Sequence, residues 1–316
     1  MTYKILIASR SFGSTSSKPW DVLKRAGCEI VQVDISNKIT EQRMAELLQG
    51  IDGAIIGVVP MTTYVLEHAP SLKVVSMHGV GVDHIDLSAA AQRGVVIANC
   101  QGTNDQSVAD LTIGLMIAVA RDIPAVDRAV RGGGWGAHAG SELWKKTLGL
   151  VGLGRIGRGV AKRALGFEMN VLAYDPYVQA ENLEAGVSMT DLHEVLKEAD
   201  FVSLHASLSG ETRHMIGMPQ LQIMKPSAYL INTSRGALVD ERALYSALQE
   251  KQIAGAALDV YDVEPPKDSP LLQLENIVVT PHIGAHTRES IERVGVMSAE
   301  NVLWTLQGGQ PHHRVA

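Results

Sequence analysis

The sequence predicts an α/β protein with two lobes, each built around a sheet of parallel strands. Its 316 residues are more than one ordinary small domain holds and enough for two separate hydrophobic cores. From residue 3 onward, short apolar runs alternate with helical patterns, which indicates βαβ units because parallel strands need crossover connections. An apolar helical stretch at 104–121 interrupts this alternation once, and the alternation then resumes.

The first lobe is expected to consist of short apolar strands separated by amphipathic helices. The expected strands are 4–9, 29–34, 53–59, 72–77 and 94–99. The expected helices are 18–27, 40–48 and 63–69. These elements place one α/β lobe in the first hundred residues.

The second lobe follows the helix at 104–121 and a glycine-rich loop at 131–140. Its expected strands are 147–152, 170–175, 201–206, 228–233, 255–260 and 276–280. The last of them carries the β-branched run 277–279, which favours a buried position. The final thirty residues are expected to be helical and to end in a mobile tail, in which His312 and His313 form no metal site.

Composition excludes several classes of partner. A net charge of −6 gives no basic surface for nucleic acid, and the longest apolar stretch, 111–120, is too short to span a membrane. Cys28 and Cys100 lie far apart and lack the spacing of zinc ligands, so neither a disulfide nor a metal is expected. The start of the chain has no leader pattern, which favours a cytoplasmic location.

A glycine-rich turn is the first motif with a specific chemistry. The segment LGLVGLGRIGRGV has the GxGxxG spacing directly after an expected strand and at the start of a helix, an arrangement that binds the pyrophosphate of a dinucleotide. Asp175, at the end of the next strand, is suited to the adenine ribose hydroxyls and would repel a 2′-phosphate, which favours NAD over NADP. The expected cofactor contacts here are Gly152, Gly154, Arg155, Ile156, Gly157 and Asp175.

Three consecutive strands of the second lobe each end in a residue that carries catalytic chemistry. Arg235, Glu264 and His282 follow the strands at 228–233, 255–260 and 276–280. Any one of them alone is more often an ion-pair or loop residue. Because the carboxyl ends of parallel strands share one edge of a sheet, we expect the three to lie together, on the same edge as the glycine turn.

Several segments resemble the signature segments of the D-isomer-specific 2-hydroxyacid dehydrogenase family. They are GLGRIG, INTSRGALVDERAL, AGAALDVYDVEPP and TPHIGAHT, with SMHGVGVDHIDLSAAAQRGVVIAN and SVADLTIGLMIAVAR in the first part of the chain. The resemblance implies a Rossmann NAD-binding domain, 100–283, inserted in a flavodoxin-like substrate-binding domain, 1–99 and 284–316. It also implies a homodimer built on the helix 104–121 and the loop that follows it.

The resemblance also implies a role for each of the three side chains that follow the strands. His282 would protonate the keto oxygen of a 2-oxo acid while NADH delivers hydride, and Glu264 would fix the imidazole and raise its pKa. Arg235 would bind the substrate carboxylate together with backbone N–H groups near Val80 and Gly81. Further expected cofactor contacts are Ser107, Thr212, Ser234, Asp259, His282 and Gly284.

The substrate is left open between two classes. The segments at 107–121 and 254–266 are similar to the 3-phosphoglycerate dehydrogenases of the family, which would place the protein in serine biosynthesis. The loop GVVPMTT, 57–63, has no cation where many of those enzymes carry arginine, which favours glyoxylate, hydroxypyruvate or another small 2-oxo acid. A phosphate would then need the loop 9–18, which offers Arg10 and Lys18. An NAD-responsive corepressor without catalytic activity is a third interpretation.

Overall fold

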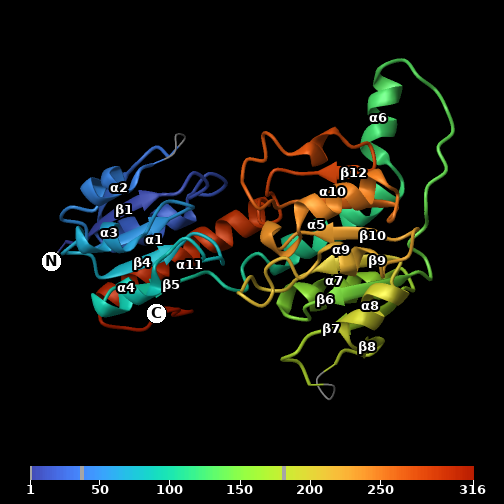
Figure 1. The fold of residues 1–316 in the computed structure, drawn as a ribbon. Coiled ribbons are helices and arrows are strands. Elements are labelled where there is room, and N and C mark those ends of the chain that lie inside the picture. Colours follow the sequence, from blue (N-terminus) through green and yellow to red (C-terminus); the bar gives the residue numbers. More distant parts are fainter. Residues whose placement is uncertain (1, 36–38, 180–182) are drawn as a thin grey trace. The chain divides into compact units, whose positions relative to one another are not determined.

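The computed structural model describes residues 2–35, 39–179 and 183–316 and divides into two compact units (Figure 1). Unit 1 comprises the chain up to Asn104 together with Ala285–Ala316, and unit 2 comprises Asp105–Gly284. The sequence placed the first junction at 99/100 and the second at 283/284. The chain therefore leaves unit 1 at the start of a helix, and it returns directly after the loop that carries His282.

Unit 1 is built on a parallel sheet with the strand order β2-β1-β3-β4-β5, which is the flavodoxin-like order. Its strands are β1 (Lys4–Ala8), β2 (Glu29–Gln32), β3 (Gly53–Ile56), β4 (Val74–Met77) and β5 (Val96–Ala98). In β1, Ile5 and Ile7 pack into the core on one face, while Leu6 and Ala8 pack into the core on the other. Residues 5–8 of strand β1 are all apolar and buried because both faces of the sheet are covered.

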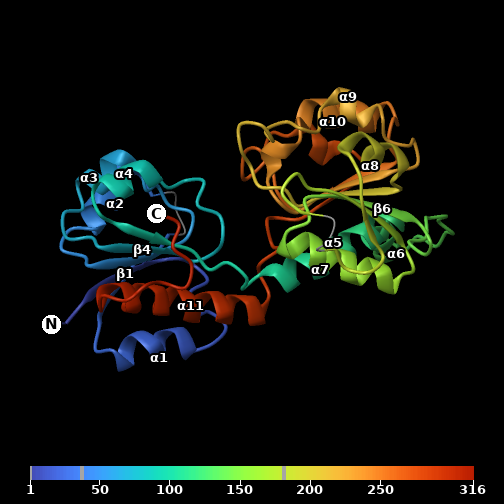
Figure 2. The same ribbon diagram turned by 90° about the horizontal axis from the view of Figure 1, so that it is seen from below.

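Helices cover both faces of the unit 1 sheet (Figure 2). One face carries α1 (Lys18–Arg25) and α11 (Arg288–Leu306), and the other carries α2 (Glu41–Leu47), α3 (Thr63–Glu67) and α4 (Leu87–Gln92). Threonine caps begin two of these helices: Thr40 accepts a hydrogen bond from the backbone N–H of Arg43, and Thr287 accepts one from Ser290. The segment after His282 therefore enters α11 at a defined residue.

The C-terminal segment is ordered along the edge of this sheet, so the predicted mobile tail is wrong. Ala98 of the edge strand β5 forms an antiparallel bridge with Arg314, and the N–H of Val315 donates to the carbonyl of Ile97. His312 lies 2.9 Å from a carboxylate oxygen of Glu300. The tail satisfies backbone groups that an edge strand would otherwise expose to solvent.

Unit 2 is built on a larger parallel sheet with the strand order β12-β11-β10-β9-β6-β7-β8. Its strands are β6 (Thr147–Val151), β7 (Asn170–Tyr174), β8 (Val187–Met189), β9 (Phe201–Leu204), β10 (Tyr229–Asn232), β11 (Gly255–Leu258) and β12 (Ile277–Val279). This is the Rossmann order, in which the direction of winding reverses between β6 and β9. The two sheets together confirm the predicted fold class.

Helices also cover both faces of the unit 2 sheet, and each face has its own apolar core. On one face lie α5 (Asp105–Ala120) and α7 (Arg155–Gly166). On the other lie α8 (Leu192–Glu198), α9 (Met218–Leu221) and α10 (Glu241–Gln249), with short 3₁₀ turns at Gly236–Leu238 and Pro270–Gln273. The loops at the carboxyl ends of the strands carry the candidate site.

Several elements were not predicted individually, and one strand differs from its prediction. The sequence analysis did not identify β8, α4 or α6 (Ile123–Arg131), and α6 has no buried residue. Strand β12 was predicted to be buried, but it lies at the edge of the sheet and Val279 is 40% exposed. Within the described ranges, none of the helices combines the length and the hydropathy that crossing a membrane requires.

Candidate active site

The glycine turn between β6 and α7 has the geometry of a dinucleotide site. Gly152 has a φ of 99°, and a Cβ there would lie 2.6 Å from the carbonyl carbon of His205. A Cβ on Gly157 would lie 2.3 Å from the carbonyl oxygen of Gly152, so the helix packs directly on the turn. A Cβ on Gly154 would meet no atom within 4 Å, and no side chain caps the start of α7. Open space beside uncapped N–H groups fits a pyrophosphate.

Asp175, which was expected to contact the ribose, also stabilises this turn. One carboxylate oxygen accepts a hydrogen bond from the N–H of Leu153 at 2.8 Å, and the other accepts one from the N–H of Tyr177 at 2.9 Å. A carboxylate oxygen has two lone pairs, so both oxygens keep an acceptor site for a ribose hydroxyl. Arg155 is exposed at the start of α7, whereas Ile156 packs against the core and offers a ligand only its backbone.

Two other expected cofactor residues lie in the loops after β9 and β10, which hydrogen bonds within unit 2 already shape. Thr212 donates to the carbonyl of Ser207 at 2.7 Å in the loop after β9. Ser234, after β10, donates to the carbonyl of Ala206 at 2.7 Å. Ser107 is buried in the first turn of α5. Thr212 thus stabilises its own loop, whereas Ser234 joins the loop after β10 to the loop after β9.

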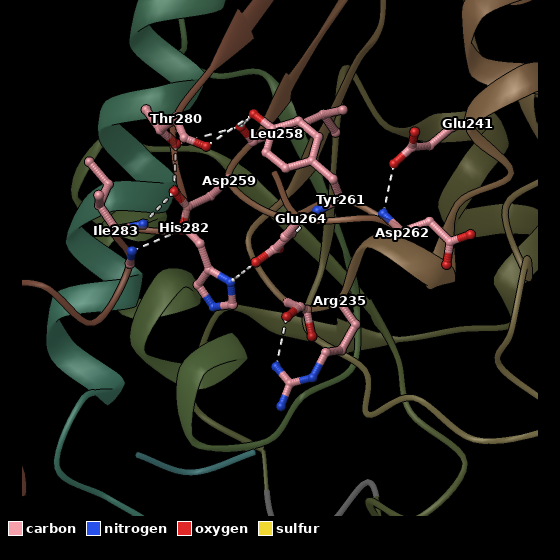
Figure 3. A network of polar contacts seen from close by, with 12 residues as sticks. Arg235, Glu241, Leu258, Asp259, Tyr261, Asp262, Glu264, Thr280, His282 and Ile283 are labelled. Carbon is pink, nitrogen blue, oxygen red and sulfur yellow. Dashed lines mark hydrogen bonds and ion pairs between the residues drawn. The ribbon is translucent and has the colours of Figure 1, made fainter. Parts of the chain in front are cut away.

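Arg235, Glu264 and His282 lie at the ends of three adjacent strands, β10, β11 and β12 (Figure 3). The imidazole Nδ1 of His282 donates to Oε2 of Glu264 at 2.8 Å. Arg235 interacts electrostatically with both side chains. The structure thus brings together the three residues that the sequence placed on one edge, and the ring nitrogen Nε2 of His282 is left pointing away from Glu264.

Asp259 fixes the loop that carries His282. The carboxylate is buried and accepts hydrogen bonds from the hydroxyl of Thr280 at 2.6 Å and from the N–H groups of Ile283 and Gly284, both at 2.8 Å (Figure 3). His282 has a φ of 54°, in the left-handed region that side chains rarely adopt. Three hydrogen bonds to one buried carboxylate stabilise this strained backbone.

Tyr261 connects the loop of Glu264 with the loop of His282. Its N–H donates to Oε1 of Glu264 at 3.1 Å, and its hydroxyl donates to the carbonyl of Thr280 at 3.0 Å. Burial raises the pKa of the Tyr261 hydroxyl to about 12, so it stays a donor at neutral pH. The pair of carboxylate and imidazole is therefore held from both loops.

Gly236 brings the loop of Arg235 against the same segment. A Cβ at this position would lie 1.9 Å from the carbonyl carbon of Tyr261 and 2.3 Å from the backbone nitrogen of Asp262. The N–H of Asp262 in turn donates to Glu241 at the start of α10 (Figure 3). Only glycine allows this contact between backbones, which sets the position of Arg235 relative to Glu264.

The pKa values of the pair shift in opposite directions. The hydrogen bond with Glu264 raises the pKa of His282 above its usual value, and this effect outweighs partial burial, which acts in the opposite direction. Burial by itself would raise the pKa of Glu264, but the hydrogen bond and the charge of His282 outweigh it and hold that pKa below its usual value. The pair therefore favours an imidazolium beside a carboxylate, which is a proton donor poised at Nε2.

Val80 and Gly81 lie in unit 1, in the loop after β4. The carbonyl of Val80 accepts a hydrogen bond from the side chain of Asn99 at 2.9 Å, which orients the peptide. Among the described residues, none accepts a hydrogen bond from the backbone N–H of Val80 or Gly81. Two neighbouring N–H groups that have no acceptor among the described residues are suited to bind a carboxylate.

Sequence reasoning missed the supporting roles. Asp259 was expected as a cofactor contact, and its carboxylate in addition holds the backbone of the His282 loop. The sequence contained one signal for this role, because an aspartate directly after an apolar strand is buried only when it is hydrogen-bonded. Nothing in the sequence indicated the contacts of Tyr261 or Gly236.

Comparison with known proteins identifies the family. The sequence model of the NAD-binding domain of the D-isomer specific 2-hydroxyacid dehydrogenases matches residues 113–284. The chain belongs to the D-isomer specific 2-hydroxyacid dehydrogenase family. It therefore contains the NAD-binding domain of that family, and unit 2, with its glycine turn, is that domain.

Relatives within the 2-hydroxyacid dehydrogenase family carry different substrate names. The chain is 44% identical over 285 residues to D-3-phosphoglycerate dehydrogenase of Methanocaldococcus jannaschii, covering 89% of this chain and 54% of that protein. It is 44% identical to glyoxylate reductase of Korarchaeum cryptofilum, covering 81% of this chain and 80% of that protein. The crystal structure of the TT0316 protein from Thermus thermophilus superimposes with a TM-score of 0.91 at 38% identity, covering 99% and 100% of the two chains.

The chain spans about half the length of the D-3-phosphoglycerate dehydrogenases that it matches, 54% and 58% in two archaeal proteins. Relatives with different substrate names thus match at equal identity.

Proposed function

We propose that the protein is an NAD-dependent dehydrogenase that interconverts a D-2-hydroxy acid and its 2-oxo acid. The observation that carries this proposal is the pair of His282 and Glu264, with a 2.8 Å hydrogen bond at Nδ1 and with Nε2 directed away from it. Bound NADH supplies the hydride to the carbonyl carbon. His282 supplies the proton to the carbonyl oxygen from Nε2, and it takes that proton back in the oxidation direction.

The remaining residues of the site bind and orient the two reactants. The N–H groups at the start of α7 hold the pyrophosphate, and Asp175 accepts the ribose hydroxyls, which favours NAD over NADP. Arg235 of unit 2 is assigned to the substrate carboxylate through its planar guanidinium, and the N–H groups of Val80 and Gly81 in unit 1 are a second assignment for substrate binding. Glu264 keeps the proton on Nδ1 and stabilises the imidazolium.

The leading substrate is 3-phosphoglycerate, with 3-phosphooxypyruvate as its oxidised form, which corresponds to a step of serine biosynthesis. The name of the Methanocaldococcus jannaschii relative supports this assignment. The alternative is reduction of glyoxylate or hydroxypyruvate, which the name of the Korarchaeum cryptofilum relative supports in part. The apolar loop after β3 also favours the alternative, because Val58 is 80% exposed there and no cation stands beside it in the sequence.

A homodimer is the proposed assembly. Helix α6 buries none of its side chains, and Ile123, Val130 and Trp135 in this helix and the loop after it are 48%, 47% and 93% exposed. Large apolar side chains exposed in one region favour a protein interface. Light scattering on the purified protein tests this assembly, and a monomer at micromolar concentration would contradict it.

NADH oxidation by the purified protein tests the reaction. The panel is 3-phosphooxypyruvate, hydroxypyruvate, glyoxylate and pyruvate, with an Arg235→Ala variant beside the wild type. Turnover of at least one acid, lost in the variant, is the expected result. If no 2-oxo acid is reduced while NADH still binds, the dehydrogenase proposal fails and an NAD-responsive binding protein becomes the better interpretation.

A further inference from the structure

A buried asparagine holds the backbone of the segment that carries Arg235. Asn232 is the last residue of β10 and is fully buried. Its side-chain Nδ2 donates to the carbonyl of Arg235 at 2.9 Å, and its Oδ1 accepts a hydrogen bond from the N–H of Ser234 at 3.1 Å. One side chain therefore bonds the backbone of Arg235 and that of the residue directly before it.

The two backbone partners fix the orientation of the Asn232 carboxamide. An N–H group needs an acceptor and a carbonyl needs a donor, so the side-chain oxygen faces Ser234 and the NH₂ group faces Arg235. Aspartate would keep the first bond but would place a second acceptor against the carbonyl of Arg235. Alanine would remove both bonds. Asparagine thus supplies a donor and an acceptor that neither replacement can supply together.

The two residues between Asn232 and Arg235 are anchored to other elements of unit 2. The hydroxyl of Thr233 lies 3.0 Å from the hydroxyl of Thr112 in α5. The hydroxyl of Ser234 donates to a carbonyl in the loop after β9. These bonds hold the middle of the segment, and the Asn232 carboxamide extends the support to the backbone of Arg235 itself.

The position of this backbone matters because the guanidinium stands at the end of a long side chain. The close backbone contact of Gly236 holds the segment on one side of Arg235, and the Asn232 carboxamide holds it on the other. A guanidinium that binds a carboxylate through two parallel hydrogen bonds needs a defined geometry. A misplacement of about 1 Å can lower a reaction rate by about 10²-fold.

We propose that Asn232 is a positioning residue for the reaction, whose carboxamide sets the backbone of Arg235 so that the guanidinium meets the substrate carboxylate. The inference rests on the proposed dehydrogenase function, in which Arg235 is assigned to that carboxylate. Asn232 then supports Arg235 as Asp259 supports His282. Each is a buried polar residue at a strand end that bonds the backbone of the loop with the reacting group.

Steady-state kinetics tests this role with the wild type, Asn232→Ala, Asn232→Asp and the matched control Asn276→Ala. Asn276 is partly buried just before β12, at the opposite end of the sheet, and its carboxamide donates to the carbonyls of Leu248 and Ala254 at 3.2 and 3.3 Å. The substrate is the 2-oxo acid of the panel that the wild type reduces fastest. Fluorescence titration gives the Kd for NADH, and melting temperatures show which variants are folded.

We expect each Asn232 variant to lower kcat/KM for the 2-oxo acid by about 10- to 100-fold. The Kd for NADH should change by no more than about threefold, because the glycine turn and Asp175 belong to other loops. Both quantities should stay within about twofold in Asn276→Ala. A folded Asn232 variant with wild-type kcat/KM would overturn the inference, and so would a Kd for NADH that rises as much as kcat/KM falls.

A second comparison tests whether Asn232 acts through Arg235. Arg235→Lys keeps the positive charge but places it on a flexible stem, which can reach a carboxylate from more than one backbone position. Adding Asn232→Ala to this variant should therefore lower kcat/KM by no more than about threefold. The same fold-change in both backgrounds would mean that Asn232 acts independently of Arg235, and the positioning role would be wrong.

If the wild type reduces none of the acids, the proposed function fails and the positioning role is tested by binding. Calorimetric titration with oxalate in the presence of NADH then compares the wild type, Asn232→Ala and Asn276→Ala. Weaker binding by Asn232→Ala alone supports the role. Equal binding by the three proteins contradicts it, and a wild type that binds no oxalate removes the carboxylate contact of Arg235 on which the inference depends.

Discussion

The strand ends of unit 2 and those of unit 1 are built in different ways. In unit 2, Glu264 and His282 each accept or donate hydrogen bonds that join neighbouring loops, and a buried carboxylate holds the backbone beside His282. In unit 1, a cavity at the carboxyl ends of the strands is lined by Arg10, which donates to the carbonyl of Ile35, and by Val58, which is 80% exposed. Reacting groups need fixed geometry, whereas a cavity that selects substrates can be lined by side chains with fewer constraints.

Removing the proton donor should have the largest effect. We expect His282→Ala to lower turnover by about 10²- to 10⁴-fold, which is typical of a lost acid–base group. The melting temperature should change little, because the side chain is 49% exposed. The control is His312→Ala, which removes an imidazole that pairs with a glutamate at 2.9 Å in unit 1. Near wild-type turnover in His282→Ala would refute the assigned role.

Weakening the support of the His282 loop should have the second-largest effect. The buried carboxylate of Asp259 accepts hydrogen bonds, and Asp259→Asn would place an NH₂ group against some of the groups that donate to it. We therefore expect the free energy of unfolding to fall by about 1–3 kcal/mol. Turnover should fall by up to about 10²-fold as the loop shifts. Asp262→Asn is the control, since Asp262 is exposed and lies 3.6 Å from Arg213. Urea unfolding and kcat decide, and equal results for both variants would show that the loop does not depend on Asp259.

The sequence was sufficient to predict most of the strands and the residues that directly follow them. Arg235, Glu264 and His282 could be placed on one edge because each comes directly after, or close to, an apolar strand of a parallel sheet. Helix α6 could not be recognised from a buried face, since it has none, although Pro124 marks its first turn. Strand β8, with three residues, is too short to show a pattern.

The supporting contacts could not be predicted because they join backbone groups or residues that are distant in the sequence. The N–H groups of Tyr261 and Ile283 carry no sequence signal, yet they donate to Glu264 and Asp259. Lys18 was offered as a candidate phosphate contact, and the sequence did not indicate its ion pair with Glu292, which comes from the other end of the chain. The catalytic roles themselves stay predictions until the variants are measured.

The pH profile of Glu264→Gln should show whether Glu264 only orients His282 or also raises its pKa. The hydrogen bond with Glu264 raises the pKa of His282, so Glu264→Gln should lower it. Reduction needs the protonated imidazole, so its activity is lost as the pH rises through this pKa, and the loss should occur at lower pH in the variant. Glu241→Gln, which alters the acceptor for the N–H of Asp262, should keep the wild-type profile. An unchanged profile for Glu264→Gln would contradict the role of its charge.

The smallest effect is expected at the cavity of unit 1, and it sharpens the contrast between the two regions. Val58 lines the cavity and is 80% exposed, so Val58→Ser should change the unfolding free energy by no more than about 0.5 kcal/mol. Val58→Ser should also change kcat little, because the side chain lies at the cavity wall and fixes no reacting group. The KM values for glyoxylate and for a dianionic acid are the parameters that should respond, and their ratio should change by only a few-fold. A large loss of stability or of kcat would show that this loop is held as firmly as the loops of unit 2. The difference between a fixed catalytic edge and an adaptable cavity would then have to be given up.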